Sequence, residues 1–136
     1  MGDTYVLDSY AVLATLGSEP GSDEIRALLQ QAEQGDVTLH MNWVNVGEVA
    51  YIVERRWGKE KVYQAVATLQ ATAVKIAPVG RELALRAAEI KAENPLAYAD
   101  AFAAALAMEE EGILITGDPE FRKLEEKLRI QWLPRE

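Results

Sequence analysis

Four acidic residues of this chain stand at the edges of predicted strands and helices. They are Asp8, Glu48, Asp100 and Asp118. Two of them come at or just after the end of an apolar run typical of a strand, one follows a strand by a few residues, and one lies in the first turn of a helix. In an open parallel sheet, strand ends and helix starts meet at one edge. Carboxylates that converge there would form an oxygen-lined pocket suited to Mg²⁺ or Mn²⁺.

Each acid also has a purely structural interpretation, and these alternatives stay open residue by residue. Asp8 can cap the helix that follows it. Asp118 stands before Pro119, which is a common way to start a helix. Asp100 can complement the positive end of its helix, and Glu48 can point to solvent. Capping does not exclude catalysis, so the joint pattern of four acids carries more weight than any one of them.

The elements that must position these acids alternate regularly along the chain. Strands are predicted at Thr4–Leu7, Val37–Met41, Val74–Ala77, Ile113–Thr116 and Ile130–Leu133. Helices are predicted at Ser9–Leu16, Ser22–Gln34, Trp43–Arg56, Lys59–Gln70, Arg81–Glu93, Tyr98–Glu111 and Pro119–Leu128. Strands that alternate with one or two helices indicate an α/β fold with a parallel sheet and right-handed crossovers. A length of 136 residues suits a single domain, which we expect to span residues 1–136.

Composition excludes several kinds of site and constrains the partners. The chain has no cysteine and a single histidine, His40, so thiolate zinc sites and histidine clusters are excluded. A net charge of -8 disfavours bulk attraction to nucleic acid. A polyanionic substrate would therefore need divalent cations and a local basic rim. Candidates for that rim are Arg55, Arg56, Lys59 and Lys61, although a solvated helix end explains the same charges.

The sequence also favours a particular compartment. Absence of cysteine fits a reducing environment. The first residues lack the basic region of a signal peptide. The uncharged stretch 62–74 is too short and too polar to span a bilayer. We therefore expect a soluble, cytoplasmic protein with no membrane association.

The sequence around the four acids resembles a known family. The matching segments are Tyr5-Val6-Leu7-Asp8-Ser9, Asn45-Val46-Gly47-Glu48-Val49, Tyr98-Ala99-Asp100-Ala101-Phe102-Ala103-Ala104-Ala105 and Leu114-Ile115-Thr116-Gly117-Asp118-Pro119-Glu120-Phe121. In this order and spacing they are similar to the PIN-domain ribonucleases, particularly the small toxins of VapBC toxin–antitoxin pairs. Each motif is short, but the four together cover essentially the whole chain.

The resemblance implies a fold, an activity and partners. It implies a single PIN-like domain with a five-stranded parallel sheet flanked by helices, a homodimer, a cognate antitoxin, and metal-dependent cleavage of single-stranded or loop RNA. The four acids would be the catalytic carboxylates that bind one or two Mg²⁺ or Mn²⁺ ions. Thr116 would support the last acid, and Asn45 would orient Glu48 or touch the substrate. Glu120 is a possible extra ligand, although charge near a helix start explains it better.

Three other functions were weighed against this one. A haloacid-dehalogenase-like phosphatase needs a second acid two residues after Asp8, where this chain has Tyr10. A response-regulator receiver needs a phosphoacceptor aspartate near Met41, and none is present there. A non-catalytic PIN-like interaction domain that retains an acidic metal pocket remains the alternative.

Overall fold

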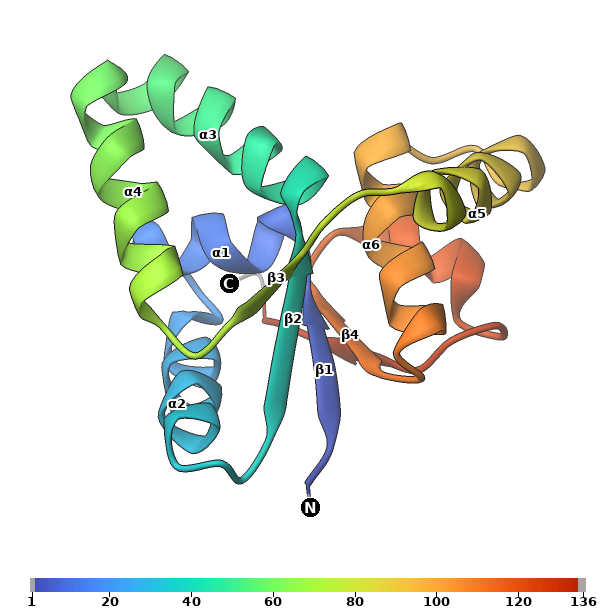
Figure 1. The fold of residues 1–136 in the computed structure, drawn as a ribbon, viewed down its shortest axis with the longest axis horizontal. Helices are drawn as coiled ribbons and strands as arrows, with labels where there is room; N and C mark the ends of the chain where they lie inside the picture. Colours follow the sequence, from blue (N-terminus) through green and yellow to red (C-terminus); the bar gives the residue numbers. More distant parts are fainter. Residues whose placement is uncertain (1, 135–136) are drawn as a thin grey trace.

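Five parallel strands form one sheet in the order β3-β2-β1-β4-β5 (Figure 1). The structure is a computed structural model, and it describes residues 2–134. The strands are β1 (Thr4–Leu7), β2 (Thr38–Asn42), β3 (Lys75–Ala77), β4 (Ile113–Thr116) and β5 (Ile130–Trp132). Because β1 lies at the centre and pairs with both β2 and β4, residues that follow these three strands are brought to the same edge.

Helices cover both faces of the sheet. The helices are α1 (Ser9–Leu16), α2 (Ser22–Glu33), α3 (Trp43–Trp57), α4 (Lys59–Ala71), α5 (Arg81–Glu93) and α6 (Tyr98–Glu109), with a short 3₁₀ helix η1 (Pro119–Leu124). Figure 1 shows α1 to α4 on one side of the sheet and α5 and α6 on the other. Each helical layer buries its own core against the sheet.

Successive side chains of the strands point alternately into these two cores. Val6 and Leu114 belong to the core under α5 and α6, whereas Leu7 and Ile115 belong to the core under α1 to α4. Successive strand residues point to opposite faces, so a continuous apolar strand buries both sides at once. The α/β fold with a five-stranded parallel sheet flanked by helices is therefore confirmed.

Most predicted elements occur within one or two residues of their expected bounds, a difference comparable to that between assignment methods. The strand predicted at Val37–Met41 is shifted by one residue, because Asn42 still pairs with Ala77 of β3. Asn42 caps α3, since its side chain accepts a hydrogen bond from the Asn45 N–H. These small shifts leave every acid at its predicted edge.

The predicted helix Pro119–Leu128 is wrong in type and length. The segment forms the 3₁₀ helix η1, which ends at Leu124. In a 3₁₀ helix residues three apart lie on one line. This spacing directs both Phe121 and Leu124 into the core under α6, where both are fully buried. The short 3₁₀ helix thus places both side chains in the same core.

Within residues 2–134, no helix is both long enough and apolar enough to cross a membrane.

Candidate functional site

Asp8 and Thr116 join the ends of the two central strands. Asp8 is fully buried after β1, and its Oδ1 accepts a hydrogen bond of 2.9 Å from the Ala11 N–H, so it does cap α1. Its Oδ2 accepts a 2.5 Å hydrogen bond from the Thr116 hydroxyl. The Thr116 Oγ1 in turn accepts from the Asp118 N–H at 2.9 Å. One hydroxyl thus connects two of the predicted acids.

Asp118 starts η1 in the way its sequence suggests. Its Oδ1 accepts a 2.9 Å hydrogen bond from the Glu120 N–H, and Pro119 occupies the first helical position. The Asp118 side chain is half-buried. The capping interpretation is therefore correct for both Asp8 and Asp118, and each carboxylate keeps its place at the edge of the sheet while it caps.

Glu48 and Asp100 come from helices on opposite faces of the sheet. Asp100 lies in the first turn of α6 and is only 7% exposed. Glu48 lies one turn into α3, is half-buried, and accepts a hydrogen bond from the Ser9 hydroxyl. Sequence reasoning missed Ser9, although its position directly after Asp8 placed a buried hydroxyl beside the acids.

The charges of the four acids act on one another. Burial raises the pKa of Asp8 to about 7; hydrogen bonds from Thr116 and Ala11 oppose this rise, and the charges of Asp100 and Asp118 add to it. Burial also raises the pKa of Asp100 to about 7, and the charges of Asp118, Glu48 and Glu120 add to the effect. No basic side chain contributes to either shift. The structure therefore brings the four predicted acids into one electrostatically coupled group.

The predicted basic rim lies elsewhere. Arg55 stacks over Tyr51 at 5.1 Å, and Arg56 lies 6.0 Å from the ring of Trp57. Both arginines belong to the last turn of α3 and are exposed, as is Lys59 after it. Seven residues of helix separate Glu48 from Arg55, which is a rise of about 10 Å. The rim is thus at the far end of α3, and its contact with a substrate stays a prediction.

Carboxylate oxygens are the ligands that Mg²⁺ and Mn²⁺ prefer, so the donor chemistry fits such an ion. The uncompensated negative charge at Asp8 and Asp100 fits it as well. In residues 2–134, however, no three acidic or histidine side chains converge closely enough to hold a metal ion as they stand. Asp8, Glu48 and Asp118 instead accept hydrogen bonds from donors of the protein itself.

A close contact between Tyr10 and Gly117 fixes the segment that carries Asp118. A Cβ at Gly117 would lie 2.7 Å from Cζ and 2.9 Å from the hydroxyl oxygen of Tyr10. Such distances are shorter than atoms tolerate, so only glycine fits there without movement. The aromatic ring of α1 therefore packs directly on the backbone between Thr116 and Asp118.

Gly117→Ala is expected to destabilise the protein by about 1–3 kcal/mol through overpacking. Gly47→Ala is the matched control, because a Cβ there meets open space on an exposed helical face and should stabilise by up to about 1 kcal/mol. Urea unfolding measures both. In a Tyr10→Ala background the Gly117→Ala change should cost much less, and equal costs in both backgrounds would contradict the contact.

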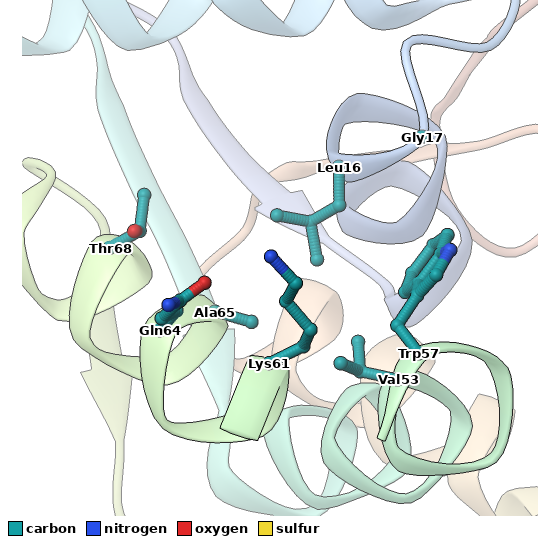
Figure 2. A pocket seen from close by; sticks show the side chains of 8 residues that line it. All are labelled: Leu16, Gly17, Val53, Trp57, Lys61, Gln64, Ala65 and Thr68. Carbon is teal, nitrogen blue, oxygen red and sulfur yellow. The ribbon is translucent and has the colours of Figure 1, made fainter. Parts of the chain in front are cut away.

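A second surface feature lies away from the acids, between α1 and the hairpin of α3 and α4. It is a hollow of about 570 Å³. Figure 2 shows Leu16, Trp57 and Lys61 around this hollow, with Ala65 on its α4 wall. Leu16 and Trp57 are 38% and 47% exposed, which is high for large apolar side chains. We call this feature the α1–α4 groove.

Comparison with known proteins gives one family and many similar folds. The family model described as PIN domain matches residues 5–127. VapBC2 of Rickettsia felis, solved with a DNA fragment from its promoter, has a TM-score of 0.76 at 16% identity, over 96% of this chain and 99% of that one. DNA-bound VapBC of Salmonella typhimurium has a TM-score of 0.73 at 17% identity, over 96% and 98%. Among proteins with curated functions, none matches the sequence.

A third solved structure is named for its activity. It is VapC20 of Mycobacterium tuberculosis, described as a sarcin-ricin loop cleaving toxin, with a TM-score of 0.72 at 16% identity. The match covers 97% of this chain and 100% of that one. Identities this low establish a shared fold and nothing beyond it.

Proposed function

Since this chain belongs to the PIN domain family, we propose that it is a metal-dependent endoribonuclease and the toxin of a type II toxin–antitoxin pair. Its substrate would be single-stranded or loop RNA, and it would act in the cytoplasm as a homodimer. The observation that carries the proposal is the coupled group of Asp8, Glu48, Asp100 and Asp118 at the carboxyl edge of the sheet, with no basic side chain to neutralise the two buried acids.

Each residue of the site would have a distinct role in this reaction. Asp8, Glu48, Asp100 and Asp118 would hold one or two Mg²⁺ or Mn²⁺ ions. Bound ions would supply Lewis-acid chemistry, which eases loss of a proton from water and stabilises charge on the phosphate. Thr116 holds the Asp8 carboxylate in place, and the Ser9 hydroxyl does the same for Glu48. Hydrolysis of this type leaves 5′-phosphate and 3′-hydroxyl ends.

The direct test incubates the purified protein with a defined structured RNA in EDTA, Mg²⁺ or Mn²⁺. Cuts that need metal and carry 5′-phosphate ends support the proposal. Cyclic phosphate ends would contradict the mechanism, because they arise from attack by the RNA's own 2′-hydroxyl. Mapping the cuts would then show which loops the protein selects.

The alternative is a non-catalytic interaction domain of the same fold. One observation favours it: the acids are engaged by protein donors rather than gathered into a ready ligand set within residues 2–134. A protein of this kind would cleave no RNA with any metal, and a melting temperature that also fails to respond to Mn²⁺ would mean that its acidic pocket holds no ion. A metal-induced rise without cleavage would instead mean a real site that lacks its substrate.

An antitoxin partner is proposed because this chain is similar in fold to VapBC complexes, which pair a toxin with its antitoxin. We propose the α1–α4 groove as a surface for apolar side chains of that partner, because Leu16 and Trp57 line it and are unusually exposed. Lys61 at the groove would pair with an acidic residue of the partner. Apolar burial with a single charge contact is typical of a docked amphipathic helix.

Ala65→Arg should fill the groove and abolish partner binding. The experiment co-expresses tagged protein in an Asp100→Asn background with the product of any small reading frame found adjacent to its gene, and measures co-purification. Gln70→Arg is the matched control, because it adds the same charge to the exposed face of α4 outside the groove lining. Retention of the partner by the Ala65→Arg variant would show that the groove is not the contact.

A further inference from the structure

Two buried amides form a continuous hydrogen-bonded chain beside the acids. Asn42 and Asn45 are both 0% exposed. The Asn42 Oδ1 accepts from the Asn45 N–H at 3.0 Å, and the Asn42 Nδ2 donates to the Asn45 Oδ1 at 2.9 Å. The Asn45 Nδ2 then donates to the carbonyl oxygen of Ala99 at 3.0 Å, across 54 residues of sequence. We call this chain the amide clamp.

The amide clamp links the two helical layers where they meet. Figure 1 shows α3 leaving the top of β2 and running away from α6, so that the two helices approach only at the start of α3. Val44 packs against the core under α6, whereas Val46 belongs to the opposite core. The first turn of α3 therefore sits across the boundary between the layers, and the bond from Asn45 to Ala99 spans it.

The residues adjacent to the clamp are two of the acids. Glu48 lies one turn after Asn45 on the same face of α3, and Asp100 directly follows Ala99. The two carboxylates repel each other, as the effect of Glu48 on Asp100 shows. Repulsion would tend to separate the helix starts. Apolar contacts alone resist this poorly, because they have no preferred direction, whereas amide hydrogen bonds are directional.

Capping of α3 accounts for the Asn42 side chain, but it does not account for the Asn45 side chain, where a well-packed apolar residue could fill the space without a buried amide. The bond from Asn45 to Ala99 at this boundary therefore points to a geometric role. We propose that Asn42 and Asn45 are positioning residues that fix the spacing of Glu48 and Asp100, and thereby give the site its preference for a small divalent ion. Mg²⁺ demands near-ideal octahedral ligands at about 2.0–2.1 Å, whereas Ca²⁺ accepts 2.3–2.6 Å and irregular geometry. A site with loosened spacing loses the small ion first.

The ion preference rests on the proposed metal site, and it is tested by binding rather than by cleavage. Mn²⁺ bound to the protein is displaced with Mg²⁺ or Ca²⁺ and followed by electron paramagnetic resonance. Asn45→Ala should lower Mg²⁺ affinity about tenfold or more and Ca²⁺ affinity much less. Thr72→Val is the control, because it also removes a side-chain bond to a helix carbonyl, far along the chain at the end of α4. Equal loss of both ions in Asn45→Ala would overturn the proposal.

The clamp itself is tested without metal, so that a negative result for the clamp can be distinguished from a negative result for the nuclease proposal. Urea midpoints are measured in EDTA for Asn45→Ala, Glu48→Gln and the double variant. Glutamine at position 48 keeps an acceptor for Ser9 but removes the charge. If the clamp holds two like charges together, Asn45→Ala should lower the midpoint less in the Glu48→Gln background than in the parent. An unchanged effect would overturn the clamp, and Asn45→Ser replaces Asn45→Ala if the latter does not fold.

Discussion

Replacement of Asp100 by Asn is expected to reduce metal-dependent RNA cleavage by about 10²–10³-fold, the usual cost of removing one charge-stabilising group from an active site. Asn keeps the shape of the side chain and its place in the first turn of α6, so the fold should persist. Three neighbouring acids raise the pKa of this buried carboxylate, compared with two for Asp8. Its charge is therefore the one that a bound cation would compensate best.

The same loss is expected for Asp8→Asn and Asp118→Asn. Glu89→Gln is the matched control, because Glu89 is exposed on α5 and is not among the acids that act on Asp8 or Asp100. Its removal should change the rate by no more than about fivefold, the scale of a surface charge. Cleavage rates are measured on one RNA with circular dichroism as a check of folding. Full activity in Asp100→Asn would refute the assignment of the site.

In EDTA, the protein is expected to lose stability as the pH rises from 5 to 8. Asp8 and Asp100 have pKa values of about 7 in the folded protein, compared with an ordinary value of 3.8. The folded state therefore holds protons that the unfolded state has released. Stability from these groups is complete below pH 4 and is lost as the pH passes through 7. A fall in melting temperature on the order of 5 °C or more across this range would be consistent with such a loss.

A divalent ion should reverse this pH dependence, because it competes with the protons for the same carboxylates. Mn²⁺ should raise the melting temperature strongly at pH 8 and weakly at pH 5. Asp100→Asn should melt higher than the parent in EDTA at pH 8, since it removes a buried charge among like charges. Differential scanning calorimetry at several pH values measures all three effects. A parent protein that gains stability in EDTA between pH 5 and 8 would contradict the pKa shifts.

Much of the fold could be predicted from local patterns. The runs 5–7 and 113–116 are short, apolar and flanked by helix-start residues, so both strands were placed correctly. Pairing order was not readable in this way, because it depends on contacts such as that between Tyr5 and Ile113, which are distant in sequence. The type of η1 was missed for a related reason: the choice of a 3₁₀ helix depends on where Phe121 and Leu124 must point.

The candidate site likewise has some features that the local sequence indicates and others that depend on contacts between distant residues. The acids could be identified because few carboxylates stand at the edges of predicted strands and helices, and several of them together there suggest a metal site. Their supports could not, since Ser9 and the link from Asn45 to Ala99 are defined by neighbours brought near only by folding. Asn42 stands at the usual position of a helix cap, but its second hydrogen bond, to the Asn45 side chain, cannot be inferred from the sequence.

The placement of β1 at the centre of the sheet has a consequence for synthesis of the chain on the ribosome. Asp8 is among the first residues made, yet Thr116 at the end of β4 and Asp118 just after it come more than 100 residues later. Parallel pairing of this kind cannot form until both strands have left the ribosome. A growing chain therefore carries isolated acids and no assembled site. The four acids can come together only after β4 and the start of η1 have left the ribosome, so any function of the site depends on the last part of the chain to be made.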